Sequence, residues 1–596
     1  MDAAEALHRL FGFAEFRPGQ AEAVRAALSD RDALVVMPTG SGKSLCYQLP
    51  ALMRQDLTLV VSPLVSLMQD QVAALERVAP GRVALINAQR GFASNAEAIE
   101  RVRGGEIRLL YVAPERFGSP RFAEALAGAR VGLFVVDEAH CVSQWGHDFR
   151  PDYFTLADAA ANVGARATLA LTATATPRVA DDIARRLRLR EPVRVTTGFD
   201  RPNLSFAVVP CRGTIDKERR LAAALDRPGA LPAIVYAGTR DASEELARGL
   251  ATTLDEEVSV YHAGMDRRAR ATAQERFMAG DARVIVATNA FGMGIDKSDV
   301  RTVCHAAVPG SLEAYYQEAG RAGRDGGPAR CLLFAEQRDK GLHVFFIQRA
   351  RLSPATFERV GERLAWAGID GRYDVALSDL AGLASGRGQR DHDSVRAVIG
   401  HLARAGMLAP LPAPPDRAAG LITGGWDRRA AAQCMSSARE AERVRWTQYR
   451  AVWEYVEGHR CRREAVLAHF GDHSPGAPEV DCCDICAPAL VPAPTPRSRT
   501  SGSAAPGRAA GDAGDLDAAI LDVVVSARPP VGRTRTVEIL RGGRSKVVAQ
   551  YSYDDLASYG DYAHLRSEEV LGRVDELLQT GRLRSTGGRF PKLRAA

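Results

Sequence analysis

Lysine is rare in this 596-residue chain: only six lysines stand among the 78 basic residues, so arginine supplies nearly all of the positive charge. The net charge of +6 is too small to indicate a polyanionic partner on its own. No apolar run approaches the roughly 18–20 residues that span a bilayer, which excludes a membrane-spanning helix. Residues 1–10 contain no basic patch followed by an apolar stretch, so we also expect no secretory signal.

Cysteine is similarly sparse outside one short window. Six of the ten cysteines are scattered through predicted core elements, whereas the other four lie between residues 461 and 486. In a chain without a secretory signal, scattered cysteines indicate reduced core thiols and a cluster indicates a metal site. The apolar content of 46% and the charged content of 25% are typical of a soluble globular protein, and the length predicts about three to five domains.

Between residues 32 and 308, short β-branched apolar runs alternate with helical stretches. Continuous apolar strands separated by helices indicate parallel sheets that are covered on both faces. The span is too long for one such sheet, and Arg201-Pro202-Asn203 lies near its middle. The sequence therefore predicts an α/β fold with two parallel-sheet domains in tandem, over residues 1–207 and 208–340.

The C-terminal part loses this strand pattern and divides into four segments. Three helical stretches followed by a short wing predict a winged helix within residues 341–428, and residues 429–488 are strongly helical and contain the cysteine window. Residues 489–514 consist largely of Pro, Ala, Gly and Ser, which cannot form a core and predict a flexible linker. Helical patterns and a final hairpin return in residues 515–596, which predicts a second winged helix.

A glycine-rich loop, residues 38–44, follows a predicted strand and opens a predicted helix. Such a loop points backbone N–H groups at a polyphosphate, and only glycine lets the backbone approach closely. Met37 stands where the strict motif has its first glycine, and an ordinary Gly/Ser turn is the alternative. The flanking elements and the rarity of lysine favour a phosphate loop, with Lys43 on the β/γ phosphates and Ser44 on Mg²⁺. The expected cofactor-binding residues here are Thr39, Gly40, Ser41, Gly42, Lys43 and Ser44.

Two acidic residues, Asp137 and Glu138, follow the apolar run Val131–Val136. A carboxylate at the carboxyl end of a strand, opposite a phosphate loop, is typical of an Mg²⁺ ligand, and the next carboxylate can take the proton of the attacking water. Many strands end in exposed acids, so the pair is a weak signal alone. Together with the glycine loop it predicts an NTP-hydrolysing site in which Asp137 binds Mg²⁺ and Glu138 is the general base.

Directly downstream, residues 143–150 contain two aromatic and two potentially cationic side chains, and His140 just before them is a third potential cation. Grooves for single-stranded nucleic acid combine stacking aromatics with cations. The alternative is that Trp145 and Phe149 are core residues, but the Gly, His, Asp and Arg between them favour an exposed loop. We expect this loop to couple strand binding to hydrolysis. The candidate DNA-binding and coupling residues are Ser143, Gln144, Trp145, His147, Phe149 and Arg150.

Residues 137–140, Asp-Glu-Ala-His, together with Thr-Ala-Thr-Ala at 172–175, resemble the superfamily 2 helicases, and residues 143–151 resemble the aromatic-rich loop of RecQ DNA helicases. The resemblance covers residues 8–335 and implies two RecA-like domains. Its other motifs are residues 11–13, 16–20, 62–64, 113–116, 261–264, 287–297 and 317–325.

The resemblance also implies residue roles around ATP. Phe13 would stack on adenine, with Arg17 and Gln20 recognising the base, and Arg321 and Arg324 would reach the γ-phosphate from the second domain. An arginine of that kind can be worth about 10³–10⁵ in rate, and its arrival from another domain makes hydrolysis depend on closure. Two residues of the segment 287–297 complete the expected cofactor-binding set, Gly294 and Asp296.

The cysteine window resembles the RecQ zinc module, in which one helix cysteine joins three from a short knuckle to give a closed tetrahedral site. Val480 stands where the family usually has a ligand. Cys482 is the nearest substitute, His473 is another candidate, and free thiols are the alternative to a metal site. The expected zinc ligands are Cys461, Cys482, Cys483 and Cys486.

Residues 515–596 resemble the RecQ C-terminal winged helix, which binds duplex DNA at a fork. The hairpin 583–593 would be its wing, although its tip is short and has no aromatic residue, which argues against a strand-separating wedge. Relative to typical members, the segment 341–428 is inserted.

The sequence thus predicts an ATP- and Mg²⁺-dependent RecQ-type DNA helicase with bound Zn²⁺. The resemblance implies 3′→5′ movement on single-stranded DNA and unwinding of duplex or branched DNA in recombination, repair and replication. We expect single-stranded, forked and duplex DNA as partners, no membrane, and a cytoplasmic, nucleoid-associated location. Protein partners stay open, with a single-stranded DNA-binding protein as one candidate. The alternatives are an RNA helicase and a nucleotide-gated DNA-binding ATPase with little unwinding.

Overall fold

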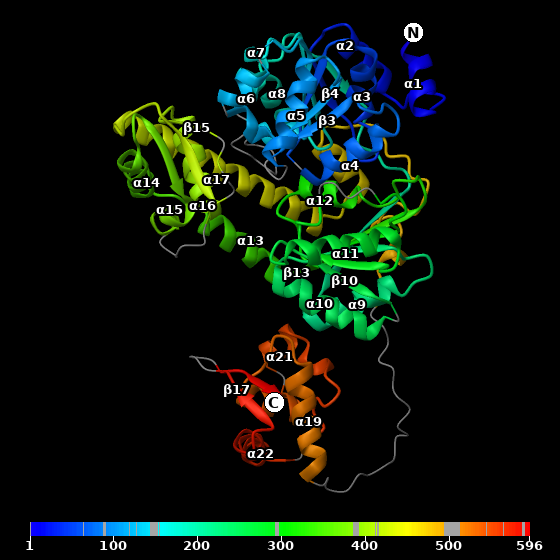
Figure 1. Cartoon of the computed structure of the whole chain (residues 1–596). Helices are drawn as coiled ribbons and strands as arrows, with labels where there is room; N and C mark the ends of the chain where they lie inside the picture. Colours follow the sequence, from blue (N-terminus) through cyan, green and yellow to red (C-terminus); the bar gives the residue numbers. More distant parts are fainter. Residues whose placement is uncertain are drawn as a thin grey trace.

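In the computed structural model, two parallel sheets are followed by smaller helical modules, which confirms the predicted fold class (Figure 1). Among the described residues, no helix has both the length and the hydropathy needed to cross a membrane. The structure describes residues 2–63, 65–87, 91–118, 120–126, 128–143, 153, 155–254, 256–292, 297–385, 392–411, 413, 416–493, 513–543, 545–563, 565–586 and 591–595.

The first lobe is a seven-stranded parallel sheet in the order β3-β4-β2-β5-β6-β1-β7. Its central strands are short apolar runs that are buried along their whole length, because helices cover both faces. The strands are β1 (Ala33–Val36), β2 (Leu57–Val61), β3 (Val83–Ile86), β4 (Leu109–Val112), β5 (Val131–Val136), β6 (Ala167–Thr172) and β7 (Val193–Thr196). The helices are α1 (Ala3–Phe11), α2 (Gln20–Leu28), α3 (Leu45–Met53), α4 (Val65–Glu76), α5 (Phe92–Arg103), α6 (Pro120–Ala125), α7 (Leu156–Asn162) and α8 (Pro177–Arg186), with short 3-10 turns η1 (Pro114–Gly118) and η2 (Ala139–Val142).

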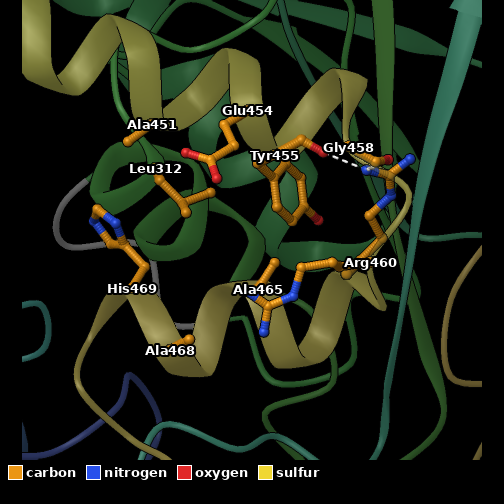
Figure 2. A pocket seen from close by; sticks show the side chains of 10 residues that line it. Leu312, Ala451, Glu454, Tyr455, Gly458, Arg460, Ala465, Ala468 and His469 are labelled. Carbon is orange, nitrogen blue, oxygen red and sulfur yellow. Dashed lines mark hydrogen bonds between the residues drawn. The ribbon is translucent and has the colours of Figure 1, made fainter.

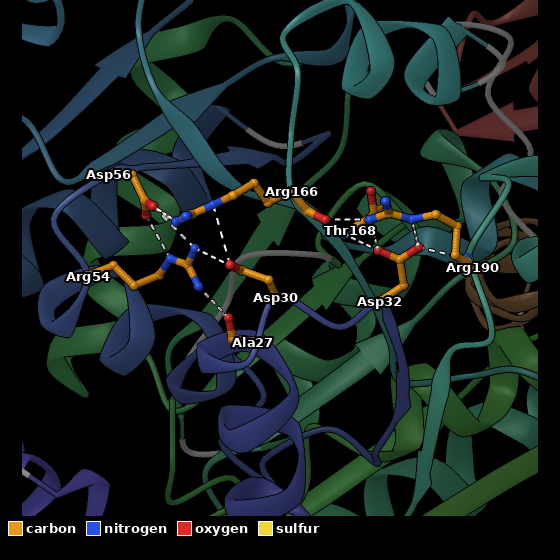
Figure 3. A network of polar contacts seen from close by, with 8 residues as sticks. All are labelled: Ala27, Asp30, Asp32, Arg54, Asp56, Arg166, Thr168 and Arg190. Atoms are coloured by element: carbon orange, nitrogen blue, oxygen red, sulfur yellow. Dashed lines mark hydrogen bonds and ion pairs between the residues drawn. The ribbon is translucent and has the colours of Figure 1, made fainter.

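A polar network fixes the amino-terminal edge of this sheet (Figure 3). The Arg54 Nε donates to Asp56 at 2.7 Å, in front of β2. Asp32, directly before β1, accepts hydrogen bonds from the Thr168 amide at 2.8 Å and from the Arg190 amide at 2.6 Å. Because the strands are held together at this edge, their opposite, carboxyl-terminal ends have fixed relative positions, and the phosphate loop and the acidic pair follow those ends.

The second lobe is a six-stranded parallel sheet in the order β10-β11-β9-β12-β13-β8. Its strands are β8 (Leu204–Cys211), β9 (Ala233–Tyr236), β10 (Val258–Tyr261), β11 (Val284–Ala287), β12 (Thr302–His305) and β13 (Ala329–Glu336). The helices are α9 (Thr214–Leu225), α10 (Arg240–Thr253), α11 (Arg267–Ala279), α12 (Leu312–Ala319) and α13 (Gln337–Arg349). The cysteine window continues this sheet beyond β8, since the Phe206 amide donates to the Cys482 carbonyl at 3.1 Å.

The segment after α13 has its own core and the element order of a winged helix, with an antiparallel sheet in the order β14-β16-β15. The predicted short wing begins at β15. The elements are α14 (Pro354–Ala367), β14 (Arg372–Ala376), α15 (Leu377–Ser385), α16 (His392–Arg404), β15 (Leu408–Leu411) and β16 (Arg417–Ile422).

The 30-residue helix α17 (Arg428–Glu457) runs from this winged helix back to the lobes, and α18 (Arg462–His469) follows it. A cavity of about 280 Å³ separates α17 and α18 from α12; Figure 2 shows Leu312, Glu454 and His469 around it. His469 closes one side of the cavity through its Nε2, which lies 2.9 Å from the Glu313 carboxylate. Helix α18 is thereby attached to the helix that precedes Arg321 and Arg324.

The C-terminal module packs around a separate core that includes Ile215 of the second lobe, and Arg528 pairs with Glu245 of α10 at 2.8 Å. The sequence pattern predicts an α-helix near residues 553–559, but the structure has there only a 3-10 turn, η5 (Tyr553–Asp555). Of the predicted wing tip, residues 586–588, only Thr586 lies within the described residues. The other elements are α19 (Ala513–Ser526), α20 (Arg533–Leu540), α21 (Lys546–Gln550), α22 (Ser567–Gln579), β17 (Leu583–Ser585) and β18 (Leu593–Ala595).

Candidate nucleotide site and zinc centre

The glycine loop connects β1 to α3, as the sequence predicts. Gly40 and Gly42 have φ values of 83° and 78°, in the left-handed region that favours glycine. A Cβ on Gly42 would lie 2.6 Å from the Gln20 Nε2, so the loop leaves no room for a side chain there. The Ser41 hydroxyl donates to the Pro38 carbonyl at 2.7 Å and closes the turn. The loop is therefore preshaped rather than dependent on a ligand for its conformation.

Lys43 lies against its own loop. Its Nζ donates to the carbonyls of Met37 at 3.0 Å and Pro38 at 3.3 Å, and no carboxylate among the described residues forms an ion pair with it. Burial lowers the pKa of Lys43, and the nearby charges of Glu138 and Asp137 oppose this shift. A desolvated ammonium that has only carbonyl partners would gain from an anionic ligand, which fits a phosphate.

Arg17 and Gln20 contact the same loop. The Arg17 Nη1 donates to the Gly40 carbonyl at 2.7 Å, and the Gln20 Nε2 donates to the carbonyls of Ser41 at 3.0 Å and Gly42 at 3.1 Å. Phe13 stands nearby in sequence with 51% of its surface exposed. Sequence reasoning missed these loop contacts, and the expectation that the three residues recognise adenine stays a prediction.

Asp137 directly follows β5, and its amide donates to the Val61 carbonyl at 2.9 Å. Burial, together with the adjacent Glu138, raises the pKa of Asp137 to about 7, while Lys43 opposes the shift. Glu138 has a φ of 48°, and its Oε2 lies 3.3 Å from the His140 Nδ1, which in turn lies 2.9 Å from the Thr172 hydroxyl. His140 therefore links the acidic pair to the segment 172–175.

The beginning of the predicted DNA loop is anchored to α8. The buried Ser143 hydroxyl donates to Asp182 at 2.8 Å, and Ser143 directly follows η2, which contains His140. The rest of the predicted set, Gln144, Trp145, His147, Phe149 and Arg150, lies outside the described residues, so its DNA contacts stay predictions.

The second lobe reaches the phosphate loop through the segment that follows α12. The Thr39 hydroxyl donates to the Gly320 carbonyl at 3.0 Å, and a Cβ on Gly40 would lie 3.5 Å from the Arg324 Cγ. Arg321 is 4% exposed, and its Nε is buried without a hydrogen-bond partner among the described residues. Both predicted arginines thus belong to a segment that meets the phosphate loop, whereas Gly294 and Asp296 lie outside the described residues.

The structure brings four cysteines together: the Sγ atoms of Cys461, Cys482, Cys483 and Cys486 all lie within 4.8 Å of one another. The Sγ–Sγ distances are 3.5 Å for 461–482, 3.8 Å for 461–483 and 3.6 Å for 483–486. In a zinc tetrahedron with Zn–S bonds of about 2.3 Å, sulfur atoms lie about 3.8 Å apart. The four thiols fit zinc, and His473 does not belong to this group.

Comparison with protein families divides the chain in the same order as its modules. A model of the DEAD/DEAH box helicases matches residues 17–183, and one of the helicase conserved C-terminal domain matches residues 216–326. A RecQ zinc-binding model matches residues 425–487, and an RQC domain model matches residues 511–596. These ranges leave residues 327–424, which include the inserted winged helix, between the second and third matches.

Three curated relatives show how far the similarity extends. The ATP-dependent DNA helicase RecQ of Bacillus subtilis is 32% identical over 98% of this chain and 81% of its own length. The probable ATP-dependent DNA helicase RecS of the same organism is 40% identical over 58% of this chain and 69% of its own length. The RecQ helicase of Pasteurella multocida is 41% identical over 58% of this chain and 54% of its own length.

Proposed function

Because this chain belongs to the RecQ family of ATP-dependent DNA helicases, we propose that it moves 3′→5′ along single-stranded DNA and unwinds duplex or branched DNA in recombination, repair and replication. The observation that carries the proposal is the contact between lobes at the phosphate loop, where Thr39 meets Gly320 and Gly40 meets Arg324. Hydrolysis at such a site depends on the relative position of the lobes, and a change in that position is what moves a strand.

In the proposed reaction, Lys43 binds the β/γ phosphates, and Arg321 and Arg324 stabilise the charge that develops on the transferred group. Glu138 accepts the proton of the attacking water at its carboxylate, oriented by His140. Ser44 and Asp137 are the proposed Mg²⁺ ligands, and the metal would neutralise phosphate charge there. A buried carboxyl with a raised pKa fits this role, since a bound cation would stabilise its ionised form.

Adenine recognition is proposed for Phe13, Arg17 and Gln20. Since Arg17 and Gln20 hold the carbonyls of the phosphate loop, base binding would change the same hydrogen bonds that shape the loop. For DNA, the proposed contacts are the loop side chains from Gln144 to Arg150, and the proposed relay to Glu138 runs through His140. Ser143 supports this path because its bond to Asp182 fixes the start of the loop.

The zinc centre, with Cys461, Cys482, Cys483 and Cys486 as proposed ligands, has a structural role, since four thiolates leave no open coordination position. Because the proposed substrate is DNA, we also propose a single-stranded DNA-binding protein as a partner. For the same reason we propose a cytoplasmic, nucleoid-associated location.

Strand displacement from labelled forks tests the proposal. Duplexes with only a 3′ or only a 5′ single-stranded tail should be compared in the presence of ATP and Mg²⁺. We expect displacement from the 3′-tailed duplex and none by the Glu138→Gln variant, which should bind ATP without turnover. Displacement from the 5′-tailed duplex alone would overturn the polarity.

The same preparation separates the two alternatives. DNA and RNA strands of equal sequence should be compared as activators of ATP hydrolysis. Stronger stimulation by RNA would indicate an RNA helicase. Stimulation by DNA without displacement of any forked duplex would indicate a nucleotide-gated DNA-binding ATPase.

A further inference from the structure

The segment that joins the two lobes places one arginine at the phosphate loop. The Arg201 Nη1 donates to the carbonyls of Thr39 at 3.1 Å and Gly320 at 3.3 Å, and its Nη2 donates to the carbonyls of Ala322 and Gly323, both at 3.0 Å. One acceptor belongs to the phosphate loop of the first lobe. The other three belong to the segment of the second lobe that contains Arg321 and Arg324. Arg201 thus bridges the two halves of the nucleotide site.

The character of this bridge depends on the guanidinium group. Its planar fork directs several N–H bonds along fixed lines, so one side chain can hold four carbonyls at once, whereas a lysine ammonium has only three donors on a flexible stem. Burial lowers the pKa of Arg201, and among the described residues no carboxylate forms an ion pair with it. The buried charge is therefore compensated mainly by carbonyl dipoles, which ties the cation to this set of backbone positions.

The backbone on both sides of Arg201 is fixed as well. Arg463 of α18 donates to the Arg201 carbonyl at 2.9 Å and pairs with Asp200. The Phe199 ring stacks on Phe470 with centroids 4.5 Å apart, and the Phe199 amide donates to Asp472 at 2.9 Å. The bridge therefore starts from a backbone that is held by residues of the zinc-binding region, so its reach is set by rigid neighbours.

We propose that Arg201 is a positioning residue that fixes the distance and orientation of the Arg321–Arg324 segment relative to the phosphate loop. This role deepens the proposed function, because it rests on a nucleotide site shared between the lobes. Arg201 is not assigned to catalysis: its bonds go to backbone carbonyls. Residues 39 and 320 come from different lobes, and Arg201 is the side chain, among those the structure describes, that donates to the carbonyls of both.

Loss of this bridge should affect turnover more than binding. Lys43 and Ser44, which are proposed to bind the phosphates and Mg²⁺, belong to the first lobe, and the contacts of Lys43 do not involve Arg201. The arginines of the second lobe would lose their fixed distance to the loop. Because a misplacement of about 1 Å can cost about 100-fold in rate, we expect kcat for ATP hydrolysis to fall by about 10- to 100-fold.

The experiment uses the full-length chain with its zinc. Arg201→Ala and Arg201→Lys are compared with Arg194→Ala, which removes an exposed arginine whose partner, Asp181 at 2.7 Å, is also exposed. DNA-stimulated kcat, ADP affinity, zinc content and unfolding temperature are measured for each variant. Amide hydrogen exchange is followed in residues 38–44 and 318–324.

We expect Arg201→Ala to lower kcat by about 10- to 100-fold, with ADP affinity, zinc content and unfolding temperature close to those of the parent. Exchange should rise in both segments, Arg201→Lys should recover part of the kcat, and Arg194→Ala should behave as the parent. An unchanged kcat overturns the proposal. So does a parallel loss of kcat, ADP affinity and unfolding temperature, which would make Arg201 a general structural residue. Since ATP hydrolysis is the readout, a parent that hydrolyses ATP but displaces no strand would refute the proposed unwinding and leave this test intact.

Discussion

Strands β1 and β8 occupy equivalent positions in the two lobes, since β1 lies beside β6 in the first sheet and β8 lies beside β13 in the second. Each is followed by a lysine, Lys43 after β1 and Lys217 after β8. In the first lobe, the hydrogen-bond partners of Lys43 among the described residues are the carbonyls of Met37 and Pro38, at the start of its own loop. In the second, Lys217 is 5% exposed, donates to the Ala306 carbonyl at 2.8 Å and pairs with Glu336 at 3.2 Å and Asp339 at 3.6 Å. Among the described residues, the same architecture thus has a lysine without a carboxylate ion-pair partner, which is the proposed phosphate ligand, and a lysine with two such partners, which forms a structural ion pair.

The largest effect should come from Lys43→Ala. Hydrolysis of ATP should fall by at least about 100- to 1,000-fold, as expected for loss of one positioned donor to a transferred phosphoryl group. Binding of single-stranded DNA and the unfolding temperature should change little, because the lysine is desolvated and has no ion-pair partner to leave behind. Steady-state ATPase and DNA-binding titrations measure this. Hydrolysis at the parent rate would show that the loop is not the phosphate site.

Strands β1 and β8 also differ in what pairs with them on the side away from β6 and β13. Strand β7 pairs with β1, whereas the cysteine knuckle bonds to β8 through Phe206. Cys482→Ser should therefore reduce bound zinc from about one per chain to near zero after dialysis and speed amide exchange at Phe206, while β1 stays protected. His473→Ala is the control and should keep its zinc. The reverse pattern, with zinc lost from the His473 variant, would make the histidine the ligand.

Lys217→Met should destabilise the second lobe without removing the nucleotide site. Among the described residues, Asp339 would be left without its cation and Glu336 would keep only Arg338, at 2.9 Å, which should cost up to about 3–5 kcal/mol of unfolding free energy. Well below the unfolding temperature, kcat for ATP should stay near the parent value. Chemical denaturation and ATPase assays measure the two quantities. The triple variant Lys217→Met, Glu336→Gln, Asp339→Asn should regain stability; a further loss would mean that the carboxylates are stable without the lysine.

The contrast between the lysines also marks what sequence could predict. The phosphate loop, the acidic pair and the cysteine window each lie within a short stretch, and each was predicted from residue types that the chemistry requires. The partners of Lys217 and Arg201 could not be predicted, because they depend on packing between segments that are distant in the sequence. Thr39 and Gly320, which both accept hydrogen bonds from Arg201, are 281 residues apart. The hydrogen bonds from Gln20 to the phosphate loop could not be predicted for a related reason. A family motif indicates that Gln20 binds the nucleotide, but it does not show which protein groups Gln20 contacts when no nucleotide is bound.

The smallest effect concerns the residues that precede the two strands, Asp32 before β1 and Asn203 before β8. Burial alone would raise the pKa of Asp32, but hydrogen bonds from Arg190 and from the Thr168 amide outweigh it and lower the pKa below 3.8. Because the pKa is lower in the folded state, the ionised carboxylate stabilises the fold at pH values above the pKa of the unfolded state. This contribution is lost as the pH falls through the pKa of the folded state.

Asp32→Asn should therefore cost about 1–2 kcal/mol of unfolding free energy at pH 7, and the difference from the parent should shrink below pH 4. The reciprocal Asn203→Asp should behave in the opposite way. The Asn203 Nδ2 donates to the carbonyls of Gly323 and Gly327, both at 2.8 Å, so a carboxylate there would face two acceptors. That variant should be destabilised at pH 7 and should recover as pH falls and the new carboxyl is protonated. Denaturation curves at several pH values give the change in unfolding free energy, relative to the parent, for each variant. If this change depends on pH with the same sign in both variants, the two positions are not electrostatic opposites.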